Sequence, residues 1–359
     1  MIIKLKLCIF FNLLFMLLIN ETFSFNEISV PPLGYNLFYE AHSKILFTDG
    51  FWGIYSLNLK DGDVENIVER HKWVESIHSF DHDILLIYSD TMSCIENISV
   101  LHDGNQEEVI YSLPAQKGGF CYPAVDPLNK KIALIETESS VDRVKKIVKN
   151  IRSNLVIMNI TSRSKKSVIK LNMPMPVFAW DNSGDRLYYF NKVNGESSFY
   201  VWDEKKGENS ILKDVRDISI LYLIPGLISE RYVIFFGEDD NKTQLIGKLD
   251  INSLQIDLKE IASQDYSIMV PNSFTPDNRF ILQKVSRVSK NRENKVYTCD
   301  INLNTTLILE DTSESLIPIG YNKVLDGLVF FRNQREIISI KLNDPSKQKV
   351  LYALPPKKP

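Results

Sequence analysis

Residues 176–215 read PVFAWDNSGDRLYYFNKVNGESSFYVWDEKKGENSILKDV, and the fold class can be predicted from this segment. Its apolar segments are four to six residues long and rich in β-branched and aromatic residues, which is typical of strands. Polar segments with Asp, Asn and Gly separate them, and such residues favour tight turns. The stretch therefore predicts one antiparallel sheet of four strands, at 176–180, 186–190, 199–203 and 210–215, with 191–198 as a loop.

Six other parts of the chain repeat this arrangement. The segments that correspond to FYVWD recur every 41 to 59 residues, centred on Ile54, Ile98, Ile157, Val201, Gly247, Cys299 and Ile340. A period near 40–50 residues with four strands per unit predicts a β-propeller, in which each sheet buries both faces against its neighbours. We therefore expect an all-β, seven-bladed β-propeller with blades at 35–75, 80–115, 120–174, 176–215, 220–262, 270–312 and 318–355.

Residues 176–190 also resemble the repeat of TolB-type propellers and of the propeller domains of prolyl oligopeptidases. Degenerate copies of that repeat are YPAVDPLNKKIALIE at 122–136 and VPNSFTPDNRFILQ at 270–283. The first blade, KILFTDGFWGIYSLNLKDG at 44–62, instead resembles the YWTD-type repeat of extracellular propellers. These resemblances imply the propeller fold, but they imply little about function because unrelated binding proteins and enzymes share it.

Several prominent residues have structural explanations. Asp126, Asp181 and Thr275 are expected to close turns, and left-handed backbone is expected at Asn129, Gly184 and Asn278. The large aromatic residues are expected to pack between blades: Trp52, Trp180, Trp202, Phe274 and Phe280.

The first 24 residues have the pattern of a secretory signal peptide. Lys4 and Lys6 precede an apolar run at 7–19, and the small residues Thr22 and Ser24 follow it. The run is short for a membrane anchor, which needs about 20 apolar residues. We expect a mature chain that starts near Phe25, forms one domain over 25–359, has no membrane span and is secreted to the periplasm or the extracellular space.

Four tripeptides of the mature chain match the N-glycosylation pattern, beginning at Asn97, Asn159, Asn241 and Asn304. In an Asn-rich chain such matches also arise by chance, so they do not establish a eukaryotic source.

Three cysteines remain after removal of the leader. Cys94 and Cys121 are candidates for a disulfide in an oxidising compartment, with two buried thiols as the alternative, and Cys299 is expected to be free.

No catalytic motif is present. The peptidases that carry such propellers use a separate hydrolase domain with Gly-x-Ser-x-Gly, and the chain has neither that motif nor residues to build that domain. His78 and His82, with Asp81 and Asp83, could hold a metal on a short helix, but we expect them in a loop that leads into a strand. The sequence thus predicts no metal site and no cofactor.

Charge is the most informative anomaly. The formal net charge is −3, yet residues 143–152 carry five positive charges and no acid, and residues 284–295 carry five against one Glu. We expect both basic segments to lie in connections between second and third strands, on one face of the propeller. In residues 141–151, Val and Ile also recur at helical spacing, so this segment could form a short amphipathic helix. The alternative to a binding surface is that both segments are solvated surface loops. The candidate binding residues are Arg143, Lys145, Lys146, Lys149, Arg152, Lys284, Arg287, Lys290 and Arg292.

These observations favour an exported, monomeric binding module for a protein or an anionic polymer such as an acidic polysaccharide. The alternative is a lyase or hydrolase that acts on a carbohydrate or an ester in the central channel. A purely structural subunit is a third possibility. Nothing in the sequence indicates specific nucleic-acid binding.

Overall fold

The computed structural model describes seventeen segments of the chain, all within one compact unit, residues 33–354. They are 44–48, 54–68, 72–80, 83–90, 95–102, 106–114, 118–128, 130–142, 147–171, 177–193, 196–215, 218–224, 231–269, 275–286, 294–311, 316–333 and 335–353. Throughout these segments the secondary structure consists of β-strands and turns, with no helix. No helix that could cross a membrane is found among the described residues.

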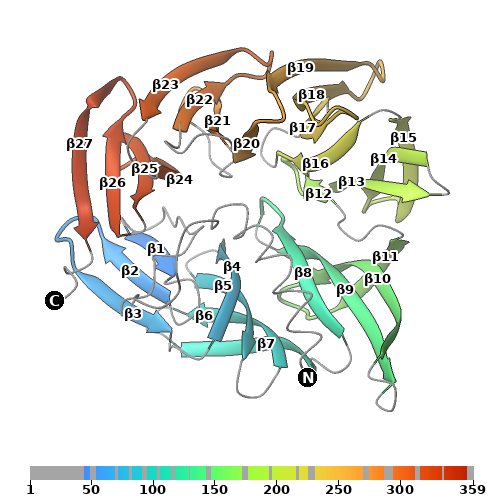
Figure 1. The fold of residues 1–359 in the computed structure, drawn as a ribbon. Helices are drawn as coiled ribbons and strands as arrows, with labels where there is room; N and C mark the ends of the chain where they lie inside the picture. Colours follow the sequence, from blue (N-terminus) through green and yellow to red (C-terminus); the bar gives the residue numbers. More distant parts are fainter. Residues whose placement is uncertain are drawn as a thin grey trace. The chain divides into compact units, whose positions relative to one another are not determined.

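The strands form seven antiparallel sheets, which follow one another around a common centre (Figure 1). Blade 1 holds β1 (Lys44–Thr48), β2 (Ile54–Asn58) and β3 (Val64–Val68). Blade 2 holds β4 (Lys72–Phe80), β5 (Asp83–Asp90), β6 (Ile95–His102) and β7 (Gln106–Pro114). Blade 3 holds β8 (Gly118–Val125), β9 (Lys131–Asp142), β10 (Ile147–Asn159) and β11 (Lys165–Leu171).

Blade 4 holds β12 (Val177–Trp180), β13 (Arg186–Val193), β14 (Glu196–Asp203) and β15 (Glu208–Asp214). Blade 5 holds β16 (Ser219–Leu223), β17 (Tyr232–Glu238), β18 (Gln244–Asp250) and β19 (Ile256–Ala262). Blade 6 holds β20 (Tyr266–Met269), β21 (Phe280–Ser286), β22 (Asn294–Cys299) and β23 (Thr305–Asp311). Blade 7 holds β24 (Leu316–Asn322), β25 (Gly327–Arg332), β26 (Glu336–Lys341) and β27 (Asp344–Ala353).

Within each sheet, strands that are consecutive in the chain are neighbours in space. The connections therefore alternate between the two ends of a blade. Connections between second and third strands leave one end, which we call the loop face: 143–146 in blade 3, 194–195 in blade 4, 239–243 in blade 5 and 287–293 in blade 6. Connections between first and second strands, and between third and fourth strands, leave the opposite end, which we call the turn face.

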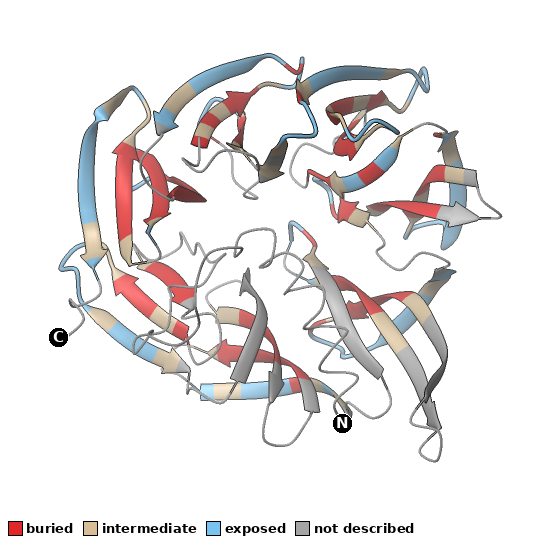
Figure 2. Ribbon diagram, viewed as in Figure 1, coloured by how far each residue is buried: buried red, intermediate tan, exposed pale blue. Residues whose placement is uncertain are grey.

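Apolar packing between blades forms the core. Seven buried clusters are present, and each draws its residues from two adjacent blades. In β13, Tyr188 packs toward blade 5, whereas Leu187 and Tyr189 pack toward blade 3, as the alternation of a strand requires. Figure 2 shows buried residues in the middle strands and exposed residues on the outermost ones.

One of these clusters closes the ring between the first and the last blade. Ile45 and Phe47 of β1 pack with Val329 and Phe331 of β25, and the rings of Phe47 and Tyr352 lie 5.6 Å apart. Blade 7 takes all four of its described strands from residues 316–353. In the described part of the chain, apolar side chains therefore close the ring, and no sheet combines strands from the N-terminal and C-terminal parts of the chain.

A bulge recurs in the outermost strand of every blade. The register against the neighbouring strand shifts by one residue in each case, and the extra residue is always aliphatic: Ile67, Ile110, Val168, Leu212, Ile261, Ile308 and Leu351. Each of these side chains is buried in, or packs against, the cluster between two blades. The bulge thus turns one more apolar side chain inward from a strand that otherwise faces solvent.

The predicted all-β propeller of seven blades is confirmed, with three described strands in blade 1 and four in each of the others. Two predicted details are wrong. Residues 72–80, which we expected to end blade 1 and enter blade 2 as a loop, form β4, and this strand pairs with β5. The expected loop at 191–198 is mostly strand, because β13 continues to Val193 and β14 begins at Glu196.

Candidate functional site

The first basic segment lies on a long β-hairpin of the loop face. β9 and β10 pair from Lys131 and Asn159 at the turn face to Asp142 and Ile147 at the loop face. β9 has 12 residues and the corresponding β13 of blade 4 has 8, counted from equivalent turns. The four extra residues correspond to about 13 Å at roughly 3.3 Å per residue. Blade 3 therefore carries an arm, which Figure 1 shows beyond its neighbours.

The helix suggested by the spacing of 141–151 is wrong. In the backbone register of the hairpin, Val141 pairs with Val148 and Ser140 pairs with Lys149. β-Branched residues fit a paired strand well, and this preference prevails over their helical spacing. Among the candidates, Lys149 and Arg152 lie on β10 by their backbone, whereas Arg143, Lys145 and Lys146 fall outside the described residues.

The second basic segment is divided between two strands and a connection. Lys284 lies on β21 between Ile268 and Lys295, and its Nζ is 4.7 Å from the centroid of the Tyr266 ring. Lys295 lies on β22, where its Nζ is 3.1 Å from a carboxylate oxygen of Glu310. These two ammonium groups belong to blade 6 itself, so our expectation of Lys284 in a loop is wrong. Three candidates, Arg287, Lys290 and Arg292, fall in the connection 287–293, outside the described residues.

An acidic turn lies on the same face, in blade 5. Asp239 closes the turn by accepting hydrogen bonds from the backbone N of Asn241 at 2.9 Å and of Thr243 at 2.8 Å. Glu238 pairs with Lys242 at 2.6 Å. Asp240 is exposed. The sequence reading missed this turn, although two consecutive aspartates between two apolar strands could have indicated it.

Two buried polar side chains, Ser198 and Gln283, make hydrogen bonds that support the strands beneath the loop face. Ser198 donates a hydrogen bond to Asp214 within blade 4 at 2.7 Å. The fully buried Gln283 donates through Nε2 to the carbonyl of Leu316, at 2.5 Å, and so ties blade 6 to the first strand of blade 7. Buried polar groups are costly unless they are hydrogen-bonded, so these contacts fix the strands from which the connections leave.

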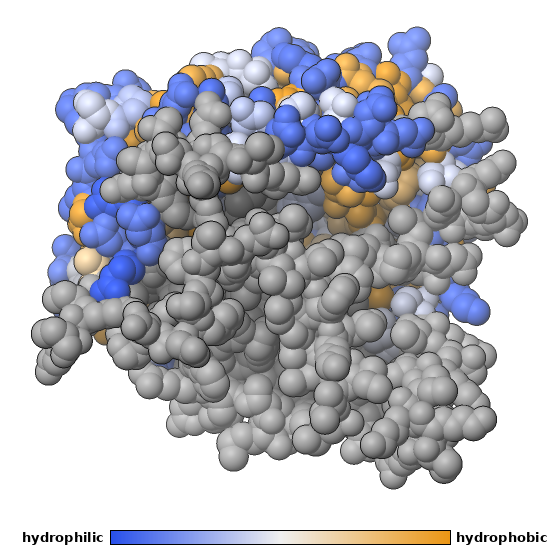
Figure 3. Space-filling view, viewed as in Figure 1, coloured by the Kyte–Doolittle hydropathy of each residue, from blue (hydrophilic) through white to orange (hydrophobic). Residues whose placement is uncertain are grey.

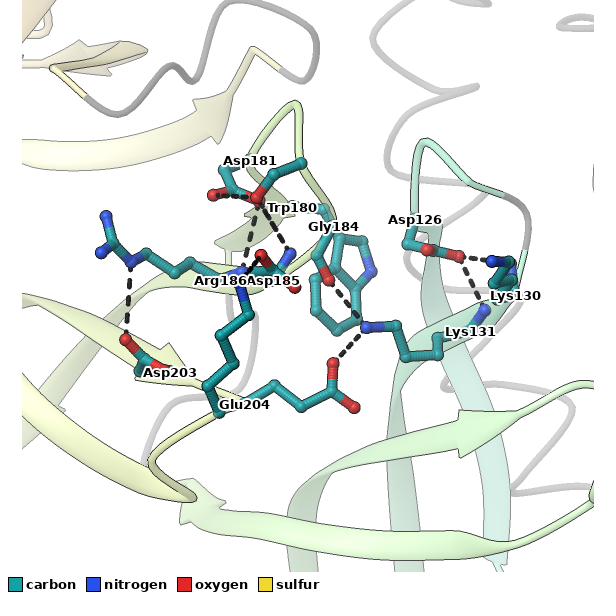
Figure 4. Close-up of polar contacts among 12 residues, drawn as sticks. Asp126, Lys130, Lys131, Trp180, Asp181, Gly184, Asp185, Arg186, Asp203 and Glu204 are labelled. Atoms are coloured by element: carbon teal, nitrogen blue, oxygen red, sulfur yellow. Dashed lines mark hydrogen bonds and ion pairs between the residues drawn. The ribbon is translucent and has the colours of Figure 1, made fainter.

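The turn face holds the polar cluster of Figure 4. Asp126 accepts hydrogen bonds from the backbone N of Lys130 and Lys131, each at 2.6 Å. Asp181 does the same for Asp185 at 3.1 Å and Arg186 at 3.2 Å. The expected turn role is thereby confirmed for both aspartates. It is also confirmed for Thr275, which accepts from the backbone N of Arg279 at 3.2 Å, and left-handed backbone is confirmed at Gly184 and Asn278.

One lysine joins blades 3 and 4 in this cluster. Lys131 donates from Nζ to the carbonyl of Gly184 at 2.7 Å, pairs with Glu204, and lies 5.0 Å from the Trp180 ring. The Trp180 indole in turn donates to the carbonyl of Ala124 at 3.0 Å. Lys131, Glu204 and the Trp180 indole each have a protein partner, so we interpret these contacts as a structural lock between blades 3 and 4 and not as a ligand site.

The other predicted features differ in their outcomes. Inter-blade packing is confirmed for Trp180, Trp202 and Phe280, while Trp52 and Phe274 lie outside the described residues. Cys299 is free and buried, as predicted. Cys94 and the side chain of Cys121 are not described, so their disulfide stays a prediction.

The predicted histidine environment is only partly visible. His78 lies on β4 and not in a loop, opposite Leu85, and its side chain is not described. His82 lies outside the described residues, as does Asp81. Across the described segments, no group of three His, Cys, Asp or Glu side chains is placed to hold a metal ion.

The described rim of the ring is mainly polar. Figure 3 shows hydrophilic side chains over most of it, with smaller hydrophobic patches between them. The outermost strands contribute single exposed aliphatic residues to this rim: Val109, Ile211, Leu258, Leu307 and Val350.

Comparison with solved structures supports the fold. An oligogalacturonate lyase in complex with manganese aligns over 91% of this chain and 91% of its own, with 14% identity and a TM-score of 0.59. A prolyl endopeptidase aligns over 88% of this chain and 50% of its own, with 10% identity and a TM-score of 0.58. TolB from Acinetobacter baumannii aligns over 79% of this chain and 63% of its own, with 13% identity and a TM-score of 0.49.

A prolyl endopeptidase, a member of one of the groups whose propeller repeat the sequence resembles, is thus among the structural neighbours. At these identities the likeness concerns the fold alone. No protein-family model matches the sequence, and no curated protein matches it.

Proposed function

We propose that this chain is an exported β-propeller whose loop face binds an anionic polymer. One observation carries the proposal. Each basic segment of an otherwise acidic chain includes the connection between the second and third strands of its blade, 143–146 in blade 3 and 287–293 in blade 6, and such connections share one face. The arm of blade 3 extends its segment further from the ring than the corresponding turn of blade 4.

The separation of the two segments favours a polymer over a compact anion. Blades 3 and 6 are three positions apart in a ring of seven, so one small anion cannot contact both segments. A linear chain of repeated negative charges can contact both at once, and many weak contacts then add up. Exposed charge pairs are each worth only about 0.2–1 kcal/mol and are screened by salt, so we expect binding that weakens steeply as salt rises.

The acidic turn of blade 5 restricts the path of such a polymer. Glu238 is paired with Lys242, but Asp240 is exposed on the loop face next to blade 6. A polymer that passes over blade 5 meets this charge and is repelled. The substitution Asp240→Lys should therefore strengthen retention on an anionic column if the bound polymer crosses this blade.

The test removes charge only from the two connections. The loop variant changes six residues to Gln: Arg143, Lys145, Lys146, Arg287, Lys290 and Arg292. Lys284 and Lys295 are left in place because the first contacts Tyr266 and the second pairs with Glu310, so their loss would disturb blade 6 itself. A control variant of equal net charge changes lysines elsewhere to Gln: Lys60, Lys130, Lys205, Lys206, Lys323 and Lys349.

Retention on immobilised heparin is compared at low and moderate salt. Six exposed contacts at about 0.2–1 kcal/mol each predict a loss of roughly tenfold or more in affinity for the loop variant. The control variant should elute close to the unmodified protein. Elution of the loop variant together with the control would mean that overall charge, and not this face, determines retention, and the proposal would then be wrong.

A further inference from the structure

One of the four glycosylation tripeptides is presented differently from the others. Asn241 lies at the tip of the tight turn between β17 and β18 on the loop face. Its backbone N is held by Asp239, and the backbone N of Lys242 donates to the Asp239 carbonyl at 3.0 Å. Within the described part of the chain, the carboxamide of Asn241 makes no hydrogen bond, and the residue is exposed. A rigid turn thus holds a free acceptor amide in solvent.

Asn97, by contrast, lies inside a sheet. It is 7% exposed on β6, paired with Tyr88 on one side and Ser112 on the other, and its side-chain oxygen accepts the Ser112 hydroxyl at 2.7 Å. The hydroxyl residue of its tripeptide, Ser99, is fully buried. A sugar on Asn97 is incompatible with this fold.

The two remaining tripeptides use the asparagine side chain to close turns of the turn face. Asn159 accepts from the backbone N of Ser162 at 2.8 Å, and Asn304 donates from Nδ2 to Asp300 at 3.1 Å. The side chains of both residues are thus engaged in hydrogen bonds within their turns, which distinguishes them from Asn241.

We infer that Asn241 is an N-glycosylation site and that Asn97 is not. The inference rests on the export that the proposed function includes. The sugar donor is an oligosaccharide linked to a lipid through pyrophosphate. The amide nitrogen of Asn241 forms a bond to C1 of the first sugar, the bond from C1 to the pyrophosphate oxygen breaks, the lipid pyrophosphate leaves and the amide loses one proton.

The position of this glycan has a consequence for the proposed ligand. The turn belongs to blade 5, the neighbour of blade 6 in the ring, and lies on the loop face. A glycan at Asn241 occupies the sector in which Asp240 already repels anions. The two features together direct a polymer away from blade 5.

The test expresses the full chain with its own leader in insect cells and collects the protein from the medium. Glycans are removed by a peptide amidase in heavy-oxygen water, which marks each formerly occupied asparagine for mass spectrometry. Thr243 supplies matched variants: Thr243→Ser keeps the acceptor pattern and Thr243→Ala abolishes it. The Thr243 contact to Asp239 uses its backbone N, so both variants retain it.

We expect the mark at Asn241 in the unmodified chain and in Thr243→Ser, its loss in Thr243→Ala, and no mark at Asn97. An unmarked Asn241, a marked Asn97 in folded protein, or a chain that fails to enter the medium would each overturn the inference. Heparin binding is measured on the mature chain made in bacteria, which carries no such glycan. Failure of the binding proposal and failure of this inference are therefore separate results.

Discussion

Substitution of Gly247 by Ala should place a methyl group where Phe235 already lies. Gly247 faces Phe235 across β17 and β18, and a Cβ at Gly247 would be 2.1 Å from Cζ and 2.4 Å from Cε2 of that ring. Real Cβ contacts do not occur below 3.0 Å, so the ring must move. Phe235 is fully buried, and its ring lies 5.2 Å from that of Phe199, which limits the movement.

The magnitude follows from two opposing effects. Overpacking of a buried site costs about 1–3 kcal/mol, and the confined ring places this site near the upper value. Replacing Gly by Ala in a strand returns roughly 0.5–1 kcal/mol through lower backbone entropy in the unfolded chain. We expect Gly247→Ala to lower the free energy of unfolding by about 2 kcal/mol, that is, the overpacking cost less the entropy gain.

A double-mutant cycle separates this clash from other effects. Phe235→Leu alone removes buried ring atoms and should also destabilise, but in the double variant the smaller side chain leaves room for the methyl group. We expect the double variant to be more stable than additivity predicts by about 1–2 kcal/mol, within the range for residues in contact. Urea unfolding of the mature chain, followed by tryptophan fluorescence, gives the midpoints and slopes. Additive effects, or a neutral Gly247→Ala, would mean that the Phe235 ring does not restrict the methyl group.

Three further predictions concern single side chains. Burial raises the pKa of the Cys299 thiol to about 12, so iodoacetamide at pH 8 should modify Cys299 only in urea. Modification of the folded protein, detected by mass spectrometry, would contradict this prediction. The hydrogen bond to Asp83 raises the pKa of His102 above its ordinary 6.5, so protonation of His102 stabilises the fold below pH 6.5 and this contribution disappears as the pH rises through the raised value. The urea midpoint of His102→Gln should approach that of the unmodified protein at high pH, and an equal gap at all pH values would argue against the effect. Leu254 has left-handed backbone at φ 56°, so Leu254→Gly should raise the urea midpoint by the equivalent of about 0.5–1 kcal/mol, whereas Leu254→Ala should not.

The features that the sequence predicted well are those that depend on local chemistry. Asp181 and Gly184 are three residues apart, and the turn that they form depends only on the hydrogen bonds of an aspartate and the φ of a glycine. The flanking strands of blade 4 follow from apolar segments of strand length. Seven repetitions of this unit predict the ring, because a four-stranded sheet with two apolar faces needs a neighbour on each side.

The features that the sequence reading missed depend on where distant residues meet. Lys131 and Glu204 are 73 residues apart, and nothing near either of them indicates the pair. The arm of blade 3 was read as a possible helix because the spacing of its valines suits both structures, and only the partner strand decides between them. From the sequence alone, Lys284 is interpreted as a free charge. Its position on β21 places its ammonium group over the Tyr266 ring.

The aliphatic bulge of the outermost strands bears on how the protein behaves at high concentration. An outermost strand offers a row of unpaired N–H and C=O groups, and a second molecule could pair with it and begin a growing aggregate. A regular strand from another chain would keep register with such an edge for only a few residues before the extra residue interrupts the match. Because the interruption recurs in all seven blades, no described sheet offers a long regular edge. The same residues that fill the gaps between blades thereby protect the rim against edge-to-edge growth.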